Sequence, residues 1–286
     1  MITMTRRVTF SAAHSDWIAS LSAEANRAVF GSHANPEPYG HNYTLDVSVQ
    51  GEIDPKTGIV VNIKEIDRIV KQWVVQVFNR KYINTGVAAF AERAVTPETL
   101  LHYIAEVLPL HLPTTARLEA LYLESEPLGY TEWRNDEDSH MNEPGMMRMT
   151  RIYEFAASHR LHSQFLSEEE NQELFGKCNY PNGHGHNYVL EVTVLGPIDS
   201  HSGRVCDETI LDNIVAQQVV DRYDHRHLNL DIPEFKAMIP SSEIVTRMIW
   251  ERLEGHIPAP ARLYRVLLRE TARNFFEYRG EKASAQ

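Results

Sequence analysis

The stretch GHNYTLDVSVQGEID, residues 40–54, recurs with conservative changes as GHNYVLEVTVLGPID, residues 185–199, an offset of 145 positions. The same offset aligns FSAAH, residues 10–14, with FAASH, residues 155–159, and it aligns Ala-Arg-Leu at residues 116–118 with the same tripeptide at residues 261–263. One fixed offset that holds over so long a stretch indicates a duplicated unit. The chain is therefore predicted to contain two tandem copies of one domain.

The length of 286 residues agrees with a duplication, because it is close to twice the commonest domain size of about 100–150 residues. The copies are separated by a polar, acidic segment that contains Pro144-Gly145, which is typical of a linker. We expect an N-terminal domain over residues 1–134, a linker over 135–147 and a C-terminal domain over 148–286.

Each copy shows the same order of hydrophobic patterns. Residues 43–49 and 188–194 alternate with period two, as half-buried strands do, and short apolar runs precede them. Apolar residues at helical spacing follow, then a second helix that Ser241 or Ser242 can cap in the second copy. Two further strands complete the unit. The pattern predicts a ββααββ domain of the α+β class, with an antiparallel sheet and both helices on one face. The expected strands are 8–12, 43–49, 117–123, 152–156, 188–194, 262–269 and 274–279, and the expected first helices are 61–78 and 206–223.

The two edges of such a sheet favour pairing with another subunit, and a closed oligomeric barrel would remove them. The net charge of −11 repels phosphate backbones and anionic lipids, and no stretch is long and apolar enough to span a membrane. We therefore expect a cytoplasmic protein that binds neither nucleic acid nor membrane. With only Cys178 and Cys206 in the chain, a disulfide is not expected.

Fourteen histidines are an unusually large number, and three of them form a pattern in the second copy. His184 and His186 are two positions apart at the start of a strand, so both imidazoles point to the same face. His159 on the neighbouring strand would complete a three-histidine zinc site with an open fourth position. The alternative is that these are surface histidines on a loop.

Cys178 lies six residues before His184 in the glycine- and asparagine-rich loop GKCNYPNG. It could be a fourth metal ligand, a nucleophile or general base, or a buried small apolar residue. We favour catalysis, because a loop leaves the thiol accessible and a nearby cation favours the thiolate. Cys206 opens an amphipathic helix and is interpreted as structural.

Two further groups suggest proton transfer and ligand binding. Asp224 and His225 place a carboxylate beside an imidazole, a pair that can relay protons, although such residues near a helix end are often only solvated or capping. Glu270 ends a predicted strand within Arg-Glu-Thr, where it either pairs with an arginine or accepts hydrogen bonds from a ligand.

Taken together, FAASHRLHS, FGKCNYPNGHGHNY, the GPIDSHSGRV turn, DHRHLNLD and the final RET resemble the 6-pyruvoyl tetrahydropterin synthase family, which includes the 6-carboxytetrahydropterin synthases of queuosine synthesis. The resemblance covers residues 148–280. It implies the tunnelling fold (T-fold), whose subunits form trimeric barrels stacked in pairs, and a zinc-dependent carbon–oxygen lyase that acts on 7,8-dihydroneopterin triphosphate. Three tandem chains would supply the six domains, so a homotrimer is expected.

The resemblance also implies a role for each site residue. His159, His184 and His186 would bind Zn²⁺, Cys178 would be the base, and Asp224 with His225 would be a relay that reaches the site of a neighbouring subunit. Glu270 would anchor the amino-pyrimidine edge of the pterin, with Glu243 as a further pocket residue. The alternatives are the carboxy-forming reaction and a non-catalytic scaffold that binds pterins or purines.

The first copy lacks most of this set. At the 145-residue offset, Cys178, His184, Asp224 and His225 correspond to His33, Tyr39, Asn79 and Arg80. His14 and His41 retain two metal positions, which His33 could complete, and Glu270 corresponds to Ser125 or, with a one-residue gap, to Glu124. We favour a decayed copy that is retained for assembly over a second site with altered chemistry.

Overall fold

The computed structural model describes residues 1–135 and 146–280, which form two compact units. The first unit comprises residues 1–149 together with Gly196–Val205, and the second comprises Thr150–Leu195 and the residues from Cys206 onward. Most of the predicted linker lies outside the described residues, and Met146 and Met147 already belong to a strand. The domain boundaries drawn from the sequence remain a prediction.

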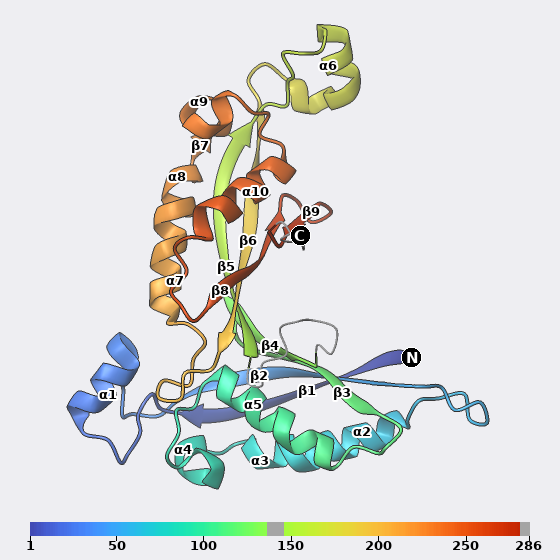
Figure 1. The fold of residues 1–286 in the computed structure, drawn as a ribbon, viewed down its shortest axis with the longest axis vertical. Helices are drawn as coiled ribbons and strands as arrows, with labels where there is room; N and C mark the ends of the chain where they lie inside the picture. The colour runs from blue at the N-terminus through green and yellow to red at the C-terminus, as the bar shows by residue number, and fades with distance from the viewer. Residues whose placement is uncertain (136–145, 281–286) are drawn as a thin grey trace, which may run out of the picture. The chain divides into compact units, whose positions relative to one another are not determined.

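The first repeat has four strands, and its helices lie on one side of them (Figure 1). Its strands are β1 (Ile2–His14), β2 (Tyr39–Gly51), β3 (Arg117–Glu126) and β4 (Gly129–Arg134). Its helices are α1 (Ala23–Phe30), α2 (Ile63–Val70), α3 (Gln76–Phe78), α4 (Ile83–Gly86) and α5 (Pro97–Val107), with a π-helical turn η2 (Lys71–Val75) and short 3₁₀ turns η1 (Gly31–His33), η3 (Ala88–Phe90) and η4 (Leu108–Leu110).

The second repeat has the same main elements in the same order, with the additional short strand β7 (Arg226–His227) and, in its described part, without a counterpart of η4. Its other strands are β5 (Met146–His159), β6 (His184–Pro197), β8 (Arg262–Arg269) and β9 (Phe275–Tyr278). Its helices are α6 (Glu168–Phe175), α7 (Glu208–Val215), α8 (Asp221–Tyr223), α9 (Leu228–Asp231) and α10 (Ser242–Leu253), with a π-helical turn η6 (Ala216–Val220) and 3₁₀ turns η5 (Gly176–Asn179) and η7 (Pro233–Lys236).

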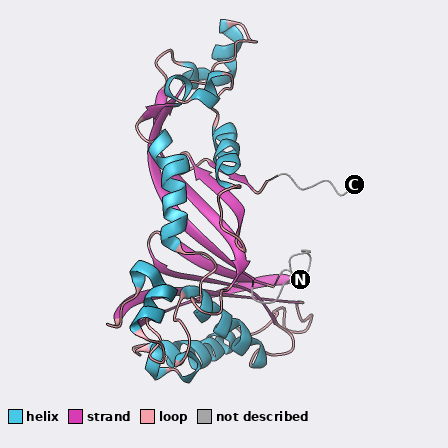
Figure 2. Cartoon of the chain, turned by 60° about the vertical axis from the view of Figure 1, so that its left-hand side comes forward, coloured by secondary structure: helices cyan, strands magenta, loops and turns pink. Residues whose placement is uncertain are grey.

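Strand order is β1-β2-β3-β4 in the first repeat and β5-β6-β8-β9 in the second. The register is also the same in both: Thr44 pairs with Glu124 as Val189 pairs with Arg269, and both sheets carry an irregularity four residues later on the second strand. In each unit the helices cover one face of the sheet (Figure 2). The predicted α+β tandem fold is confirmed, and the barrel, as an assembly of several chains, remains a prediction.

The core of each unit lies between the helices and one face of the sheet. On β2, Leu45, Val47 and Val49 are fully buried, and Leu190, Val192 and Val194 are their counterparts on β6. This is the alternation that the sequence pattern predicted.

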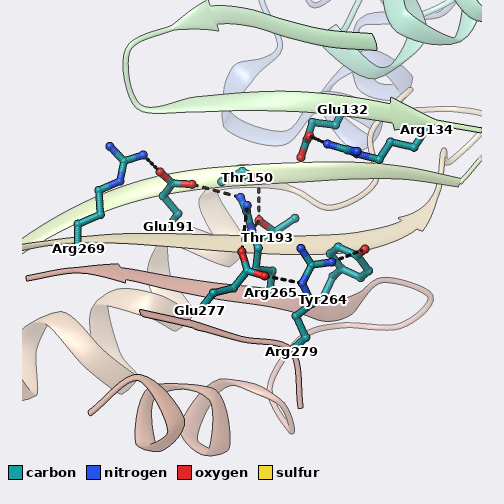
Figure 3. Close-up of polar contacts among 10 residues, drawn as sticks. All are labelled: Glu132, Arg134, Thr150, Glu191, Thr193, Tyr264, Arg265, Arg269, Glu277 and Arg279. Carbon is teal, nitrogen blue, oxygen red and sulfur yellow. Dashed lines mark hydrogen bonds and ion pairs between the residues drawn. The ribbon is translucent and has the colours of Figure 1, made fainter. Parts of the chain in front are cut away.

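The opposite face of the second sheet is polar. Glu191 is 1% exposed and accepts hydrogen bonds from Arg265 and Arg269, while the hydroxyls of Thr150 and Thr193 are 2.8 Å apart (Figure 3). A buried carboxylate needs such partners, because an unpaired charge away from water is strongly destabilising. The charged network indicates that this face is not a second apolar core.

Two details differ from the sequence expectation. Each repeat has an additional helix between its first two strands, α1 and α6, which end at Gly31 and Gly176 in the left-handed region (φ 58° and 51°). Ser241 occupies the N-cap position of α10 without a side-chain hydrogen bond, and the Ser242 hydroxyl instead donates to Glu270. Ser241 thus stands at the predicted N-cap position, but the expected hydrogen bond from a backbone N–H of the helix to its side chain is not formed.

Both cysteines are free thiols, as expected. Within the described parts of the chain, no helix combines the length and the apolar character that crossing a membrane requires.

Candidate metal and active site of the second repeat

Three histidines meet where β5 ends and β6 begins. One ring nitrogen from each of His159, His184 and His186 lies within 4.8 Å of the others, and the Nε2 atoms of His159 and His184 are 3.3 Å apart. The His159 ring is buried and its Nδ1 lies 2.7 Å from the carbonyl oxygen of Pro240. Because a carbonyl can only accept, Nδ1 of His159 carries the proton and Nε2 presents its lone pair to the cluster.

The donor set fits zinc. Two nitrogens bound to one tetrahedral zinc at the usual bond length lie about 3.3 Å apart, which is the His159–His184 spacing. Burial lowers the pKa of His159 and of His184, and the neighbouring imidazoles lower both further. Both rings are thus kept in the neutral form that a metal ligand requires.

Gly183 allows the chain to enter β6 at this place. Its φ is 70°, and a Cβ there would lie 2.6 Å from the carbonyl oxygen of His159. Only glycine adopts this conformation readily and leaves space for that carbonyl. The close approach brings His184 beside His159.

Glu270 lies beside the histidines. Its Oε1 is 3.7 Å from Nε2 of His186 and accepts a hydrogen bond of 2.6 Å from the Ser242 hydroxyl, while its Oε2 accepts one of 3.0 Å from Asn274. Burial opposes its ionisation, but the hydrogen bonds from Ser242 and Asn274, followed by the nearby His186 and His159, lower its pKa overall. Glu270 is therefore an ionised, oriented acceptor at the site.

Cys178 lies in η5, half-buried. Burial, and then the negative charge of Glu270, raise the pKa of Cys178. The sequence suggested that a nearby cation favours the thiolate, whereas the carboxylate beside the thiol has the opposite effect. The loop is held by Asn179, whose side-chain oxygen accepts from Arg160 (3.0 Å) and lies 2.9 Å from Nδ1 of His162.

Asp224 and His225 form the expected pair. Nδ1 of His225 is 2.7 Å from Oδ2 of Asp224, and Oδ1 of Asp224 accepts a hydrogen bond of 2.8 Å from the backbone N–H of Ala156. That backbone bond, and then His225, lower the pKa of Asp224. His225 has φ 55° and its side chain is 83% exposed, so the imidazole points to solvent.

Glu243 lies in the first turn of α10 and is exposed. Sequence reasoning missed the supporting residues of the site, which are Pro240, Ser242 and Asn274. The serine pair before α10 was visible in the sequence as a possible cap, but its bond to Glu270 depends on strands that are distant in the chain.

The first repeat places different side chains at the same corner. The rings of His14, Tyr39 and His41 stand where the three histidines stand, but the Tyr39 hydroxyl donates a 2.8 Å hydrogen bond to Asp16. In residues 1–135 and 146–280, the histidines of the second repeat are the one group of three or more side chains close enough to share a metal ion. The shared sheet register places Ser125, not Glu124, at the position of Glu270.

Comparison with known proteins agrees with the duplication. A family model described as 6-pyruvoyl tetrahydropterin synthase matches twice, at residues 3–135 and 148–281. The 6-pyruvoyl tetrahydrobiopterin synthase of Homo sapiens is 43% identical over 134 residues, which cover 47% of this chain and 92% of that protein.

Two further relatives were found. The 6-carboxy-5,6,7,8-tetrahydropterin synthase of Bacillus subtilis is 27% identical over 118 residues, 39% of this chain and 76% of that protein. The structure of Caenorhabditis elegans 6-pyruvoyl tetrahydropterin synthase is 43% identical, with a TM-score of 0.46, and covers 48% of this chain and 96% of that one. On the double match of the family model, the chain belongs to the 6-pyruvoyl tetrahydropterin synthase family, whose domain it carries twice.

Proposed function

We propose that the second repeat is a zinc-dependent lyase of the 6-pyruvoyl tetrahydropterin synthase type, which converts 7,8-dihydroneopterin triphosphate with loss of triphosphate. The observation that carries the proposal is the His159–His184 pair of Nε2 atoms, 3.3 Å apart, with the ionised Glu270 beside it. The similarity to a human relative of that name supports the same reaction.

His159, His184 and His186 would hold the zinc, which when bound acts as a Lewis acid and makes adjacent C–H bonds of a coordinated substrate more acidic. The proton of His159 stays on Nδ1, bound to Pro240, so the ring keeps its orientation.

Glu270 would bind the pterin. Ser242 and Asn274 each engage one oxygen of its carboxylate, which fixes the plane of the group and leaves other lone pairs to accept from a ligand. Two adjacent N–H donors of an amino-pyrimidine match such a carboxylate, and a ligand that lacks them would leave it unpaired.

Cys178 would remove and return side-chain protons of the substrate as general base. Its raised pKa means that the thiol needs positive charge near it, which a cation at the three histidines supplies. Asp224 would orient His225 and stabilise its protonated form. Since the His225 side chain is exposed, we propose that the pair completes the site of a neighbouring subunit.

The test is to incubate the zinc-loaded protein with 7,8-dihydroneopterin triphosphate, measure released triphosphate and identify the pterin by mass spectrometry. A 6-pyruvoyl product together with triphosphate is the expected result. A 6-carboxy product would assign the chain to the other reaction of the family. No release by wild type would favour a binding scaffold and contradict the proposal, and equal release by wild type and Cys178→Ala would contradict the proposed role of Cys178 as the base.

A further inference from the structure

One loop is built twice with the same backbone. We call residues 54–60 the first loop and residues 199–205 the second loop. In each, a glycine N–H donates to the carbonyl of the aspartate that opens the loop (2.7 and 2.9 Å), and the aspartate N–H donates to the residue after the glycine (3.0 Å in both). The glycines, Gly58 and Gly203, have φ 74° and 72°. Differences in what the two loops contact therefore arise from their side chains and surroundings.

The second loop is packed within the first unit. The Thr96 hydroxyl donates a 2.6 Å hydrogen bond to the carbonyl of Gly203, and the N–H of Val205 donates to Glu98 at 3.3 Å. The fit is tight, because a Cβ on Gly203 would lie 2.9 Å from Cγ2 of Thr99. Glu98 is only 2% exposed. The surface around Thr96 and Glu98 is thus covered by the second loop.

An ion pair marks this contact. Arg204, the residue after the loop glycine, places its guanidinium 3.6 Å from Oδ2 of Asp16, and the side chains of Arg204 and Asp16 are 12% and 3% exposed. The same Asp16 oxygen accepts the hydrogen bond of Tyr39. A carboxylate this deeply buried requires such partners.

The equivalent surfaces elsewhere are open. Among the described residues, no atom lies within 4 Å of a Cβ built on Gly58, and Ile59 is 48% exposed. In the second repeat, Ser241 and Glu243 occupy the positions of Thr96 and Glu98, and Glu243 is exposed where Glu98 is buried. One loop, the second, is therefore docked on the surface around Thr96 and Glu98. The first loop and the equivalent surface around Ser241 and Glu243 are both open.

The side chains of the first loop and of the open surface on the second repeat are chemically complementary. At the 145-residue offset, Arg204 corresponds to Ile59 and Asp16 to Leu161, so an ion pair in one place is an apolar pair in the other. Exchanged partners would not fit: Arg204 on Leu161 would bury an unpaired charge, and Ile59 on Asp16 would leave the carboxylate without its guanidinium. Each loop is suited to one of the two surfaces.

We propose that the first loop docks on the second repeat of another copy of this chain, with Ile59 of one chain against Leu161 of the other. By the symmetry of the repeats, the Ser241 hydroxyl donates to the carbonyl of Gly58 and Glu243 accepts from the N–H of Val60. Leu161 follows His159 by two residues, so the docked loop covers one side of the candidate metal site. The docking depends on surface shape and charge alone and does not require the proposed reaction.

The test compares Ile59→Arg, Leu161→Asp and the double variant by light scattering and analytical ultracentrifugation of the full chain. Wild type is expected to associate. Each single variant places an unpaired charge in the interface and is expected to weaken association by about 100-fold or more. The double variant recreates the pair found in the first unit and is expected to recover at least about tenfold of the loss.

The matched control is Leu110→Arg, which puts the same charge on a leucine that is 78% exposed elsewhere and is expected to leave the mass unchanged. A monomeric wild type, single variants that associate like wild type, or a double variant no better than the singles would overturn the proposal. Because Ile59 is on an exposed loop, Ile59→Arg tests the docking even if Leu161→Asp does not fold.

Discussion

The two repeats share a backbone but not a chemistry, and the corner where the first strand ends shows this most clearly. In the second repeat the rings of His159 and His184 are 4.6 Å apart between centroids, and in the first the rings of His14 and Tyr39 are 4.5 Å apart. The ring positions agree closely, while the imidazole of His184 is replaced by the phenol of Tyr39 in the first repeat. The two halves therefore share the fold but differ in the side chains at the candidate site.

In the first repeat, the tyrosine at the position of His184 is accompanied by an aspartate that binds it. The Tyr39 hydroxyl needs an acceptor, and Asp16 supplies it. Burial, and then Asp16, raise the pKa of Tyr39, so the phenol stays protonated and donates. Burial also lowers the pKa of His14 to about 4, so its imidazole is neutral near neutral pH. At this corner the Tyr39 hydroxyl and Oδ2 of Asp16 are paired, whereas Nδ1 of His14 and Oδ1 of Asp16 are buried without a hydrogen-bond partner among the described residues.

The two repeats also differ in the residue that precedes the second strand. Pro38 stands where the second repeat has Gly183, whose φ is 70°. Proline fixes φ near about −65°, so the first repeat enters its second strand with a different backbone at this position, although Tyr39 still lies beside His14.

The two repeats also differ at the positions of Asp224 and His225. Asn79 Oδ1 accepts from the N–H of Ser11 at 3.1 Å, just as Asp224 accepts from Ala156, and Arg80 keeps the left-handed backbone of His225 (φ 60°). The hydrogen bond from the first strand to this side chain is therefore present in both repeats, whereas the carboxylate and the imidazole are present only in the second.

The largest effect is expected from Cys178→Ala. Loss of a general base typically costs about 10² to 10⁴ in rate, so turnover is expected to fall by that factor while zinc content stays unchanged. The matched control is His33→Ala, at the equivalent position of the first repeat, which is expected to keep full turnover. Equal losses in both variants would show that the first repeat takes part in the chemistry.

Glu270→Gln is expected to have a smaller effect, mainly on substrate affinity. An amide offers one acceptor oxygen in place of two, and a hydrogen bond to a charged group contributes about 1.5–3 kcal/mol, so KM is expected to rise by about 10- to 150-fold. Glu124→Gln, one residue before the equivalent Ser125, is the control in steady-state kinetics. A fall in kcat with unchanged KM would contradict an anchoring role.

Part of this account follows from the sequence and part does not. The strands and the three histidines were predictable, because period-two patterns and a His-x-His motif report which side chains share a face. Helices α1 and α6 were not, since they have eight residues each and α6 is rich in glutamate without an apolar stripe. The contacts of Pro240 and Ser242 arise only when a loop, a helix start and two strands meet in space.

The smallest predicted effect concerns pH. Because the folded-state pKa of Asp224 is lowered, its ionised form stabilises the second unit above the unfolded-state value of about 3.9, and this contribution is lost as pH falls through the folded value. Since the pair is exposed, Asp224→Asn is expected to lower the stability at neutral pH by under about 1 kcal/mol. Denaturant unfolding should show the difference shrink below about pH 4. A difference that grows on acidification would contradict the assignment.

The zinc content of the full-length chain tests most directly whether the metal chemistry resides in the second repeat alone. Inductively coupled plasma mass spectrometry of the dialysed protein is expected to give about one zinc ion per chain, unchanged in His14→Ala and lost in His184→Ala. About two zinc ions per chain, or a loss of zinc in His14→Ala, would contradict the account.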